Sequence, residues 1–209
     1  MAEVVYIDPA QPSDHLIHQV AKVIKGGGII IYPTETLYGL GANPFDPEAV
    51  ERLFRIKGRE AGKPIPFLIK DQEMLETLVA DVPSTAKQLM EQYWPGPLTL
   101  IFRAKEGLPP LLRGEAGTIG VRISTHPIAR LIVEAVDIPL TATSANPAGE
   151  KDLTDARSIA EILGDQVDLV IDGGNVAGQG STVVDLTVDP PRVVRAGMIK
   201  FSPPFSKGG

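Results

Sequence analysis

The hydrophobic and polar positions at the start of the chain switch between the periods of strands and helices. Val4–Ile7 is a short strand-like run, and apolar residues from Leu16 to Ile24 then recur at helical spacing. The segment Pro12-Ser13-Asp14 offers an N-cap for that helix, and Gly26-Gly27-Gly28 ends it. Ile29–Tyr32 is continuously apolar, as in a strand that is covered on both faces. The chain therefore opens with a predicted β-α-β unit.

The same alternation continues to the end of the chain. Asp46 as N-cap and Pro47 at the first helical position begin a second helix, which ends near Lys57. Further strands are predicted at 66–69, 98–102, 118–123, 140–143, 169–171, 182–186 and 192–194, and further helices at 83–93, 127–135 and 155–163, the last capped by Thr154. This order predicts an α/β fold with a twisted mixed sheet and flanking helices.

Composition narrows the class of protein. The 209 residues include 43% hydrophobic and 22% charged residues, a globular balance that excludes disorder, collagen and coiled coils. The length fits one large domain or two very small ones, and no linker divides the chain internally. The absence of cysteine excludes disulfides, Cys-ligated zinc and a thiol nucleophile, and fits a reducing compartment. With no secretory signal and no membrane-spanning run, we expect a cytoplasmic protein without a membrane partner.

Familiar nucleotide motifs are absent, and the histidines indicate little. The segment 58–64 has one residue too few between its glycines for a P-loop, and neither Gly39-Leu40-Gly41 nor Gly178-Gln179-Gly180 has the third glycine of a dinucleotide site. His15 and His18 have a spacing compatible with a metal site, but an exposed helix face is the favoured interpretation. His126 fits a helix cap better than a catalytic residue. No metal-binding residue is predicted.

Polar and cationic residues gather where the apolar strands end, which is where ligands bind in open α/β sheets. The segment 33–41 brings hydroxyls, a carboxylate and a phenol, suited either to a small polar ligand or to an ordinary loop. Lys57, Arg59 and Lys63 suit a triphosphate, although cations also stabilise a helix C-terminus. Arg122 suits a substrate carboxylate or a protein carboxylate. Together with the small polar residues at 141–147 and 178–182, and with Arg195, they predict an anion-binding cleft.

Six segments taken in order resemble the YrdC/Sua5 family over nearly the whole chain. They are Pro33-Thr34-Glu35-Thr36-Leu37-Tyr38-Gly39-Leu40, Lys57-Gly58-Arg59, Trp94-Pro95-Gly96-Pro97-Leu98-Thr99, Val121-Arg122, Ser144-Ala145-Asn146 and Ser181-Thr182-Val183-Val184-Asp185. The resemblance implies a single YrdC-like α/β domain over residues 1–201 with a concave substrate cleft, followed by a flexible tail at 202–209. The chain resembles the short, single-domain form of the family, so we expect it to lack the linker and second domain of longer Sua5 members.

The resemblance also implies an activity. Members are L-threonylcarbamoyladenylate synthases, which make threonylcarbamoyl-AMP and pyrophosphate from L-threonine, bicarbonate and ATP with Mg²⁺. Downstream transfer proteins place the threonylcarbamoyl group on adenosine 37 of tRNA. Carried over by position, the ATP-binding residues are Lys57, Arg59, Thr118, Ser144, Asn146 and Arg195, with Lys57 and Arg59 in the catalytic role. The threonine-binding residues are Thr34, Tyr38, Arg122, Ala142 and Ser181.

Three positions depart from the family pattern. Ser124 stands where members often have proline, Leu68 where many have histidine, and Ala196 where proline commonly follows the arginine. None of these departures removes a charged residue of the expected site. Two other functions stay open: a module that handles carbamoyl-adenylate, and an RNA-binding module that uses the basic cleft. The net charge of −6 argues against RNA binding as the main role and leaves it as weak binding.

Overall fold

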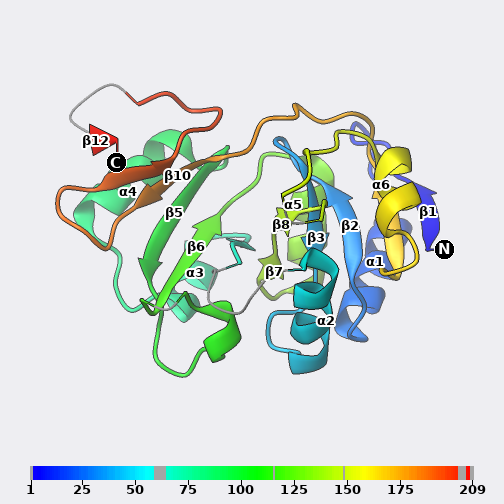
Figure 1. Cartoon of the computed structure of the whole chain (residues 1–209), viewed down its shortest axis with the longest axis horizontal. Coiled ribbons are helices and arrows are strands. Elements are labelled where there is room, and N and C mark those ends of the chain that lie inside the picture. The colour runs from blue at the N-terminus through cyan, green and yellow to red at the C-terminus, as the bar shows by residue number, and fades with distance from the viewer. Residues whose placement is uncertain (1, 59–64, 115, 148, 202–205, 208–209) are drawn as a thin grey trace.

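The computed structural model describes residues 2–58, 65–114, 116–147, 149–201 and 206–207. Its strands form two mixed sheets, which lie side by side in Figure 1. The five-stranded sheet has the order β1 (Glu3–Tyr6), β9 (Leu169–Asp172), β2 (Ile30–Pro33), β3 (Tyr38–Gly41) and β8 (Thr143–Ser144). The seven-stranded sheet has the order β12 (Ser206–Lys207), β11 (Arg192–Arg195), β10 (Thr182–Asp185), β5 (Leu98–Arg103), β6 (Thr118–Arg122), β4 (Phe67–Leu68) and β7 (Leu140–Thr141).

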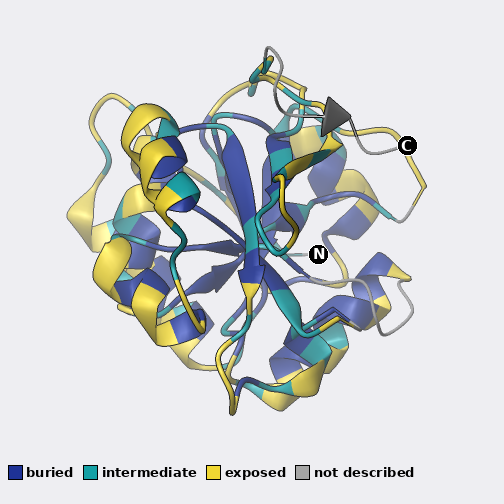
Figure 2. Cartoon of the chain, turned by 90° about the vertical axis from the view of Figure 1, so that its left-hand side faces the viewer, coloured by how far each residue is buried: buried dark blue, intermediate teal, exposed yellow. Residues whose placement is uncertain are grey.

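Helices cover the outer surfaces of this pair of sheets. They are α1 (Asp14–Lys25), α2 (Pro47–Lys57), α3 (Gln72–Leu78), α4 (Ser84–Tyr93), α5 (Pro127–Val136) and α6 (Ala156–Leu163), with a 3₁₀ turn at Pro110–Leu112. Helices α1 and α5 pack on each other and on β2, whereas α6 packs on β9. Figure 2 shows the result as buried strands in the middle and exposed helix faces around them.

One short stretch of chain passes directly from the seven-stranded sheet to the five-stranded sheet. Residues 140–141 pair with β4 in the seven-stranded sheet, and 143–144 pair with β3 in the five-stranded sheet. Thr141 holds this change of sheet: its Oγ1 accepts from the Ala42 amide (2.8 Å) and donates to the Leu40 carbonyl (3.1 Å). The Tyr32 hydroxyl donates to the Thr141 carbonyl (3.0 Å). Ala142 therefore lies at the boundary of the sheets, where its amide donates to Pro66 O (2.8 Å).

The α/β prediction is confirmed, and the differences are instructive. The strands divide between two mixed sheets instead of forming one. The segment 38–41, expected as a loop, is strand β3, and α3 was not predicted. The cap of α6 is Asp155, not Thr154, because the Asp155 carboxylate accepts from the Ser158 amide (2.9 Å). In the expected tail, Ser206–Lys207 pair with β11, and the remaining residues after 201 lie outside the described part of the chain.

Strand β3 is rich in glycine because of its neighbour. Gly39 and Gly41 lie opposite β2, and the buried Tyr32 ring sits against both of them. A Cβ atom at Gly41 would lie 2.8 Å from the Tyr32 ring, closer than real Cβ contacts allow. The glycines therefore serve the packing of a strand, and not the formation of a turn. Among the described helices, none is long and apolar enough to cross a membrane.

Thr141→Val should destabilise the fold by about 1–3 kcal/mol, because it leaves the buried Ala42 amide without its acceptor. Urea unfolding followed by circular dichroism measures this loss. Thr143→Val is the matched control, since Thr143 is also buried in the same stretch, at 6% exposed against 0% for Thr141, but its hydroxyl makes no hydrogen bond to any described residue. Equal losses in both variants would contradict the role given to Thr141.

Candidate functional site

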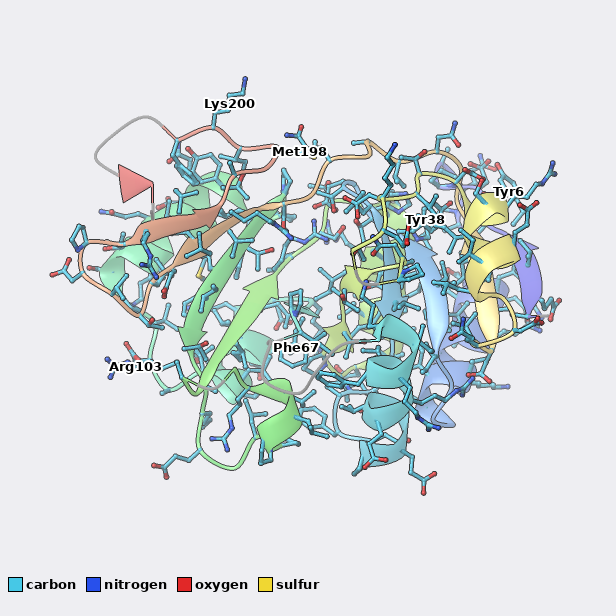
Figure 3. The ribbon with its side chains drawn as sticks, viewed as in Figure 1. Tyr6, Tyr38, Phe67, Arg103, Met198 and Lys200 are labelled. Carbon is cyan, nitrogen blue, oxygen red and sulfur yellow. The ribbon has the colours of Figure 1, made fainter. Side chains whose placement is uncertain are left out.

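A cavity of about 630 Å³ lies between the two sheets and takes its walls from both. Its described lining residues are Thr34, Thr36, Leu37, Tyr38, Gly39, Lys57, Pro66, Phe67, Thr99, Ile101, Gly120, Arg122, Ala142, Thr143, Ser144, Asn146, Pro147, Gly149, Asp152, Gly180, Ser181, Val183, Arg195 and Ala196. Figure 3 shows Phe67 in the interior between the sheets and Tyr38 on the other side of that space. Hydroxyl groups and cations make up most of the polar residues of this lining, so the cavity suits a polar, anionic ligand.

One end of the cavity is built around Lys57, the last residue of α2. The helix starts where Asp46 caps it and stops at Gly58, which has a left-handed conformation (φ 56°). The buried Lys57 ammonium reaches across to the chain beyond β8, where it donates to Ser144 O (2.8 Å), Asn146 O (2.5 Å) and Asn146 Oδ1 (2.9 Å). These three acceptors fix the position of the ammonium at this end of the cavity.

Ser144 and Asn146 form a compact turn at this end. The Ser144 hydroxyl donates to Asn146 Oδ1 (2.7 Å), and Asn146 Nδ2 donates to Glu150 O (2.7 Å) and to Asp152 Oδ1 (3.3 Å). Both side chains therefore have fixed orientations, with Lys57 bound to the same amide oxygen. The arrangement is a preorganised set of small polar groups beside a cation.

Arg122, at the end of β6, lies on another part of the cavity wall. Its Nη1 donates to Glu35 Oε1 (2.5 Å) and to Thr36 Oγ1 (3.1 Å). Both interpretations of this arginine from sequence therefore find support in its position, because it pairs with a protein carboxylate and also lines the cavity. Glu35 is not among the lining residues.

Ser181 and Arg195 close the wall on the side of β10 and β11. Arg195 donates through Nε and Nη2 to Ser181 O (3.1 and 3.0 Å), and through Nη2 to Ser181 Oγ (2.9 Å). The same Oγ shares a hydrogen bond with Thr99 Oγ1 (2.8 Å). These contacts place a guanidinium and two hydroxyls side by side.

Thr34 and Tyr38 organise the segment between β2 and β3. The Thr34 hydroxyl donates to Leu37 O (2.6 Å) and accepts from the Thr36 and Leu37 amides, which closes a tight turn. The Tyr38 hydroxyl donates to Gly174 O (2.7 Å) and so anchors the connection from β9 to β10, which crosses between the sheets in Figure 1. Burial raises the pKa of Tyr38 to about 12, so its phenol stays protonated at neutral pH.

The structure brings most of the predicted site residues together. Thr34, Tyr38, Lys57, Arg122, Ala142, Ser144, Asn146, Ser181 and Arg195 all line the cavity. Thr118 begins β6 on the same face as Gly120 and Arg122, but it is not a lining residue. Arg59, with Lys63, lies outside the described residues. Thr99 and Asp152 also line the cavity, but the sequence predicted no role for either of them, although Thr99 belongs to one of the six family segments.

The acidic residues of the cavity indicate how a magnesium ion could be bound there. Asp152 is the one acidic residue among its described lining residues, and no described cluster of three or more His, Asp or Glu could hold a metal ion. Mg²⁺ prefers oxygen ligands and usually keeps several waters when it binds with a nucleotide. The residues present thus fit a magnesium ion that phosphate oxygens would carry in, with Asp152 as the one carboxylate among the described lining residues.

Comparisons with known proteins agree with this geometry. Residues 22–197 match the family model Sua5/YciO/YrdC, described as "Telomere recombination", and the chain belongs to that family. It is 41% identical over 182 residues to the threonylcarbamoyl-AMP synthase of Pyrococcus abyssi, covering 87% of this chain and 54% of that protein. It is 36% identical over 205 residues to the uncharacterized protein YciO of Escherichia coli, covering 97% of this chain and 99% of YciO.

Solved structures give the same result. The crystal structure of P. abyssi Sua5 complexed with L-threonine superposes with a TM-score of 0.90 at 38% identity, over 94% of this chain and 58% of that one. The crystal structure of E. coli YciO superposes with a TM-score of 0.88 at 36% identity, over 95% and 97%. The chain thus spans just over half of the Pyrococcus protein and nearly all of YciO.

His126 generates a pH prediction. It is the N-cap residue of α5 but makes no side-chain cap bond, and its buried Nδ1 has no hydrogen-bond partner among the described residues. Burial lowers the pKa of His126, an effect that the charge of Glu35 partly opposes. The unfolded chain therefore binds a proton at His126 more readily, so wild-type stability should fall as the pH drops below about 6.5.

His126→Gln should remove this component, so that the variant loses less free energy of unfolding than the wild type between about pH 8 and about pH 5.5. Urea unfolding at both pH values measures the difference, with His15→Gln on the exposed face of α1 as the control. The prediction is wrong if wild type and His126→Gln lose the same stability.

Proposed function

We propose that this chain binds ATP and L-threonine in the cavity between its two sheets and joins them with bicarbonate to give threonylcarbamoyl-AMP and pyrophosphate. The observation that carries this proposal is the division of one cavity into two polar ends. The first end holds Lys57 with Ser144 and Asn146, and the second holds Arg122, which is bonded to Thr36 Oγ1; Thr34 and Ser181 line the same cavity. The names of the synthase relatives, and the L-threonine in the Pyrococcus structure, support the same interpretation.

The threonine end would use complementary groups. The guanidinium of Arg122 offers N–H donors to the α-carboxylate, and a planar fork matches a carboxylate better than a point charge does. The hydroxyls of Thr34 and Ser181 suit the amine and hydroxyl of threonine. At Ala142 the amide is already bonded to Pro66, so the carbonyl is the backbone acceptor for the substrate amine.

At the ATP end, cationic and small polar side chains would bind the nucleotide. Lys57 lies beside Ser144 and Asn146, whose side chains are already fixed by hydrogen bonds. Arg195 extends the cationic wall towards Ser181. Thr118 and Arg59 complete the set that the family pattern assigns to ATP, with Lys57 and Arg59 in the catalytic role of neutralising the phosphates.

The reaction itself requires little covalent work from the protein. The neutral threonine amine attacks the carbon of bicarbonate and water leaves, which forms a carbamate. A carbamate oxygen then attacks the α-phosphorus of ATP as pyrophosphate leaves. Positioning and charge neutralisation accelerate such a displacement without a protein nucleophile. Magnesium bound to the phosphates would neutralise further charge on the leaving pyrophosphate. The product would pass to the proteins that transfer the threonylcarbamoyl group to tRNA.

The deciding experiment is pyrophosphate release by the purified protein with ATP and magnesium, omitting L-threonine and bicarbonate one at a time. Release that needs both, with the mass of threonylcarbamoyl-AMP in the products, supports the proposal. Release that is indifferent to threonine would instead favour carbamoyl-adenylate chemistry. No release, combined with salt-sensitive RNA binding that ATP cannot displace, would favour the RNA-binding alternative.

Arg122→Lys should raise the KM for L-threonine about tenfold or more, because lysine keeps the charge beside Glu35 but loses the bidentate fork. The KM for ATP should stay within about threefold. Steady-state pyrophosphate release measures both constants, and Arg130→Lys, at an exposed ion pair of α5, is the matched control. An equal rise in both constants would show that Arg122 is not specific to the threonine end.

Lys57→Met should act in the opposite direction, raising the KM for ATP about tenfold or more while the KM for threonine changes by less than about threefold. The loss follows from the missing charge and from the Ser144 and Asn146 oxygens that lose their donor. Lys70→Met is the control, because Lys70 pairs with Asp137 outside the cavity lining. Unchanged ATP kinetics in Lys57→Met would remove this lysine from the site.

A further inference from the structure

The ion pair between Arg122 and Glu35 is unusual for a pair at a ligand cavity. Its side chains are 7% and 14% exposed, respectively, and the carboxylate lies behind the cavity wall rather than in it. A buried carboxylate beside an anion-binding arginine weakens that arginine's attraction for an incoming carboxylate, because the charges of like sign repel. Glu35 can therefore assist the binding of a carboxylate only through an effect other than its charge.

The hydrogen bonds indicate that role. Both described bonds of the Arg122 guanidinium, to Glu35 Oε1 and to Thr36 Oγ1, start from the same nitrogen, Nη1. A guanidinium has five N–H donors in a rigid plane, so fixing one corner of that plane sets the direction of the others. Because Arg122 lines the cavity, the donors on Nη2 and Nε are the ones left for a ligand there.

Glu35 is itself held from behind. The Ser124 hydroxyl donates to Glu35 Oε2, and Ser124 Oγ accepts from the His126 amide (3.1 Å) at the start of α5. Ser124 is buried, and it occupies a position where the sequence departs from the family pattern. A series of hydrogen bonds therefore runs from the His126 amide through Ser124 and Glu35 to Arg122. It connects the start of a helix to the cavity wall, and each described bond in it has a defined donor and acceptor.

We propose that Glu35, held by Ser124, is a positioning residue that aims the free edge of the Arg122 guanidinium at the carboxylate of the amino-acid substrate. This rests on the proposed function in so far as Arg122 binds the carboxylate of L-threonine. Glu35 acts through orientation, and the charge that it contributes works against binding. Glu35→Gln should then differ from Glu35→Ala, because glutamine keeps an acceptor for Nη1 and offers its amide N–H to Ser124.

The first measurement uses the free protein and needs no activity. In ¹H–¹⁵N spectra of the arginine guanidinium groups, the signals that Arg122→Lys removes belong to Arg122. We expect hindered rotation of its Nη groups in the wild type and in Glu35→Gln, and rapid averaging in Glu35→Ala. The positioning role is wrong if the Arg122 signals of Glu35→Ala are as hindered as those of the wild type.

The second measurement separates orientation from charge. Glu35→Ala should raise the KM for L-threonine about tenfold, Glu35→Gln should stay within about threefold of the wild type, and the KM for ATP should stay within about threefold in both. Ser124→Ala should give an intermediate rise. Glu134→Gln, which removes the carboxylate of an exposed ion pair on α5, is the matched control. Thermal unfolding of each variant checks that the fold persists.

The outcomes distinguish this inference from the proposed function. A lower KM for threonine in both Glu35 variants would show that Glu35 only repels the substrate, and an equal rise for both substrates would show a merely structural role. Either result overturns the inference. If the wild type neither uses nor binds L-threonine by calorimetry, the proposed function fails, and binding of L-serine and L-alanine to the same variants then tests the positioning role. Binding of none of these amino acids overturns both.

Discussion

The hydrogen bonds of Thr141 are the constraint on which the site depends. The chain from Leu140 to Ser144 leaves one sheet and enters the other within five residues, and Thr141 supplies a donor and an acceptor where regular strand pairing stops. Buried backbone groups at such a change of sheet must find partners, because an unpaired one costs free energy comparable to a lost hydrogen bond. The polar residues that follow, Thr143, Ser144 and Asn146, then line the cavity between the sheets.

The two buried cations of the cavity are treated differently, and the difference gives each end its character. Lys57 donates to neutral oxygens of Ser144 and Asn146, and a cation at that end suits the several negative charges of a triphosphate. Arg122 is paired with Glu35, so the other end is closer to neutral and selects a ligand by the direction of its hydrogen bonds.

Local signals in the sequence predicted the local structure well. The cap at Asp46, the proline at Pro47 and the apolar spacing of α2 specify that helix, and the structure has the predicted end at Lys57. Strand β3 escaped prediction because Gly39 and Gly41 are typical of turns, whereas here they make room for Tyr32 on a neighbouring strand. The division into two sheets and the Arg122–Glu35 pair depend on contacts between segments far apart in the sequence, which no local pattern encodes. The family resemblance predicted most of the candidate site residues. The structure showed which of them line the cavity and which are hydrogen-bonded to one another.

Ser181 connects two parts of the cavity wall through its hydroxyl. Its Oγ is bonded at once to Thr99 and to Arg195, so a ligand that claims a hydrogen bond from Ser181 changes what remains for Arg195. Two ligands that meet at such a shared group do not bind independently. The resulting coupling free energy is reciprocal, so whatever the first ligand does to the affinity of the second, the second does equally to the first. The equilibrium affinities of the two substrates would then favour neither order of binding. A preferred order would have to come from the rates at which they bind.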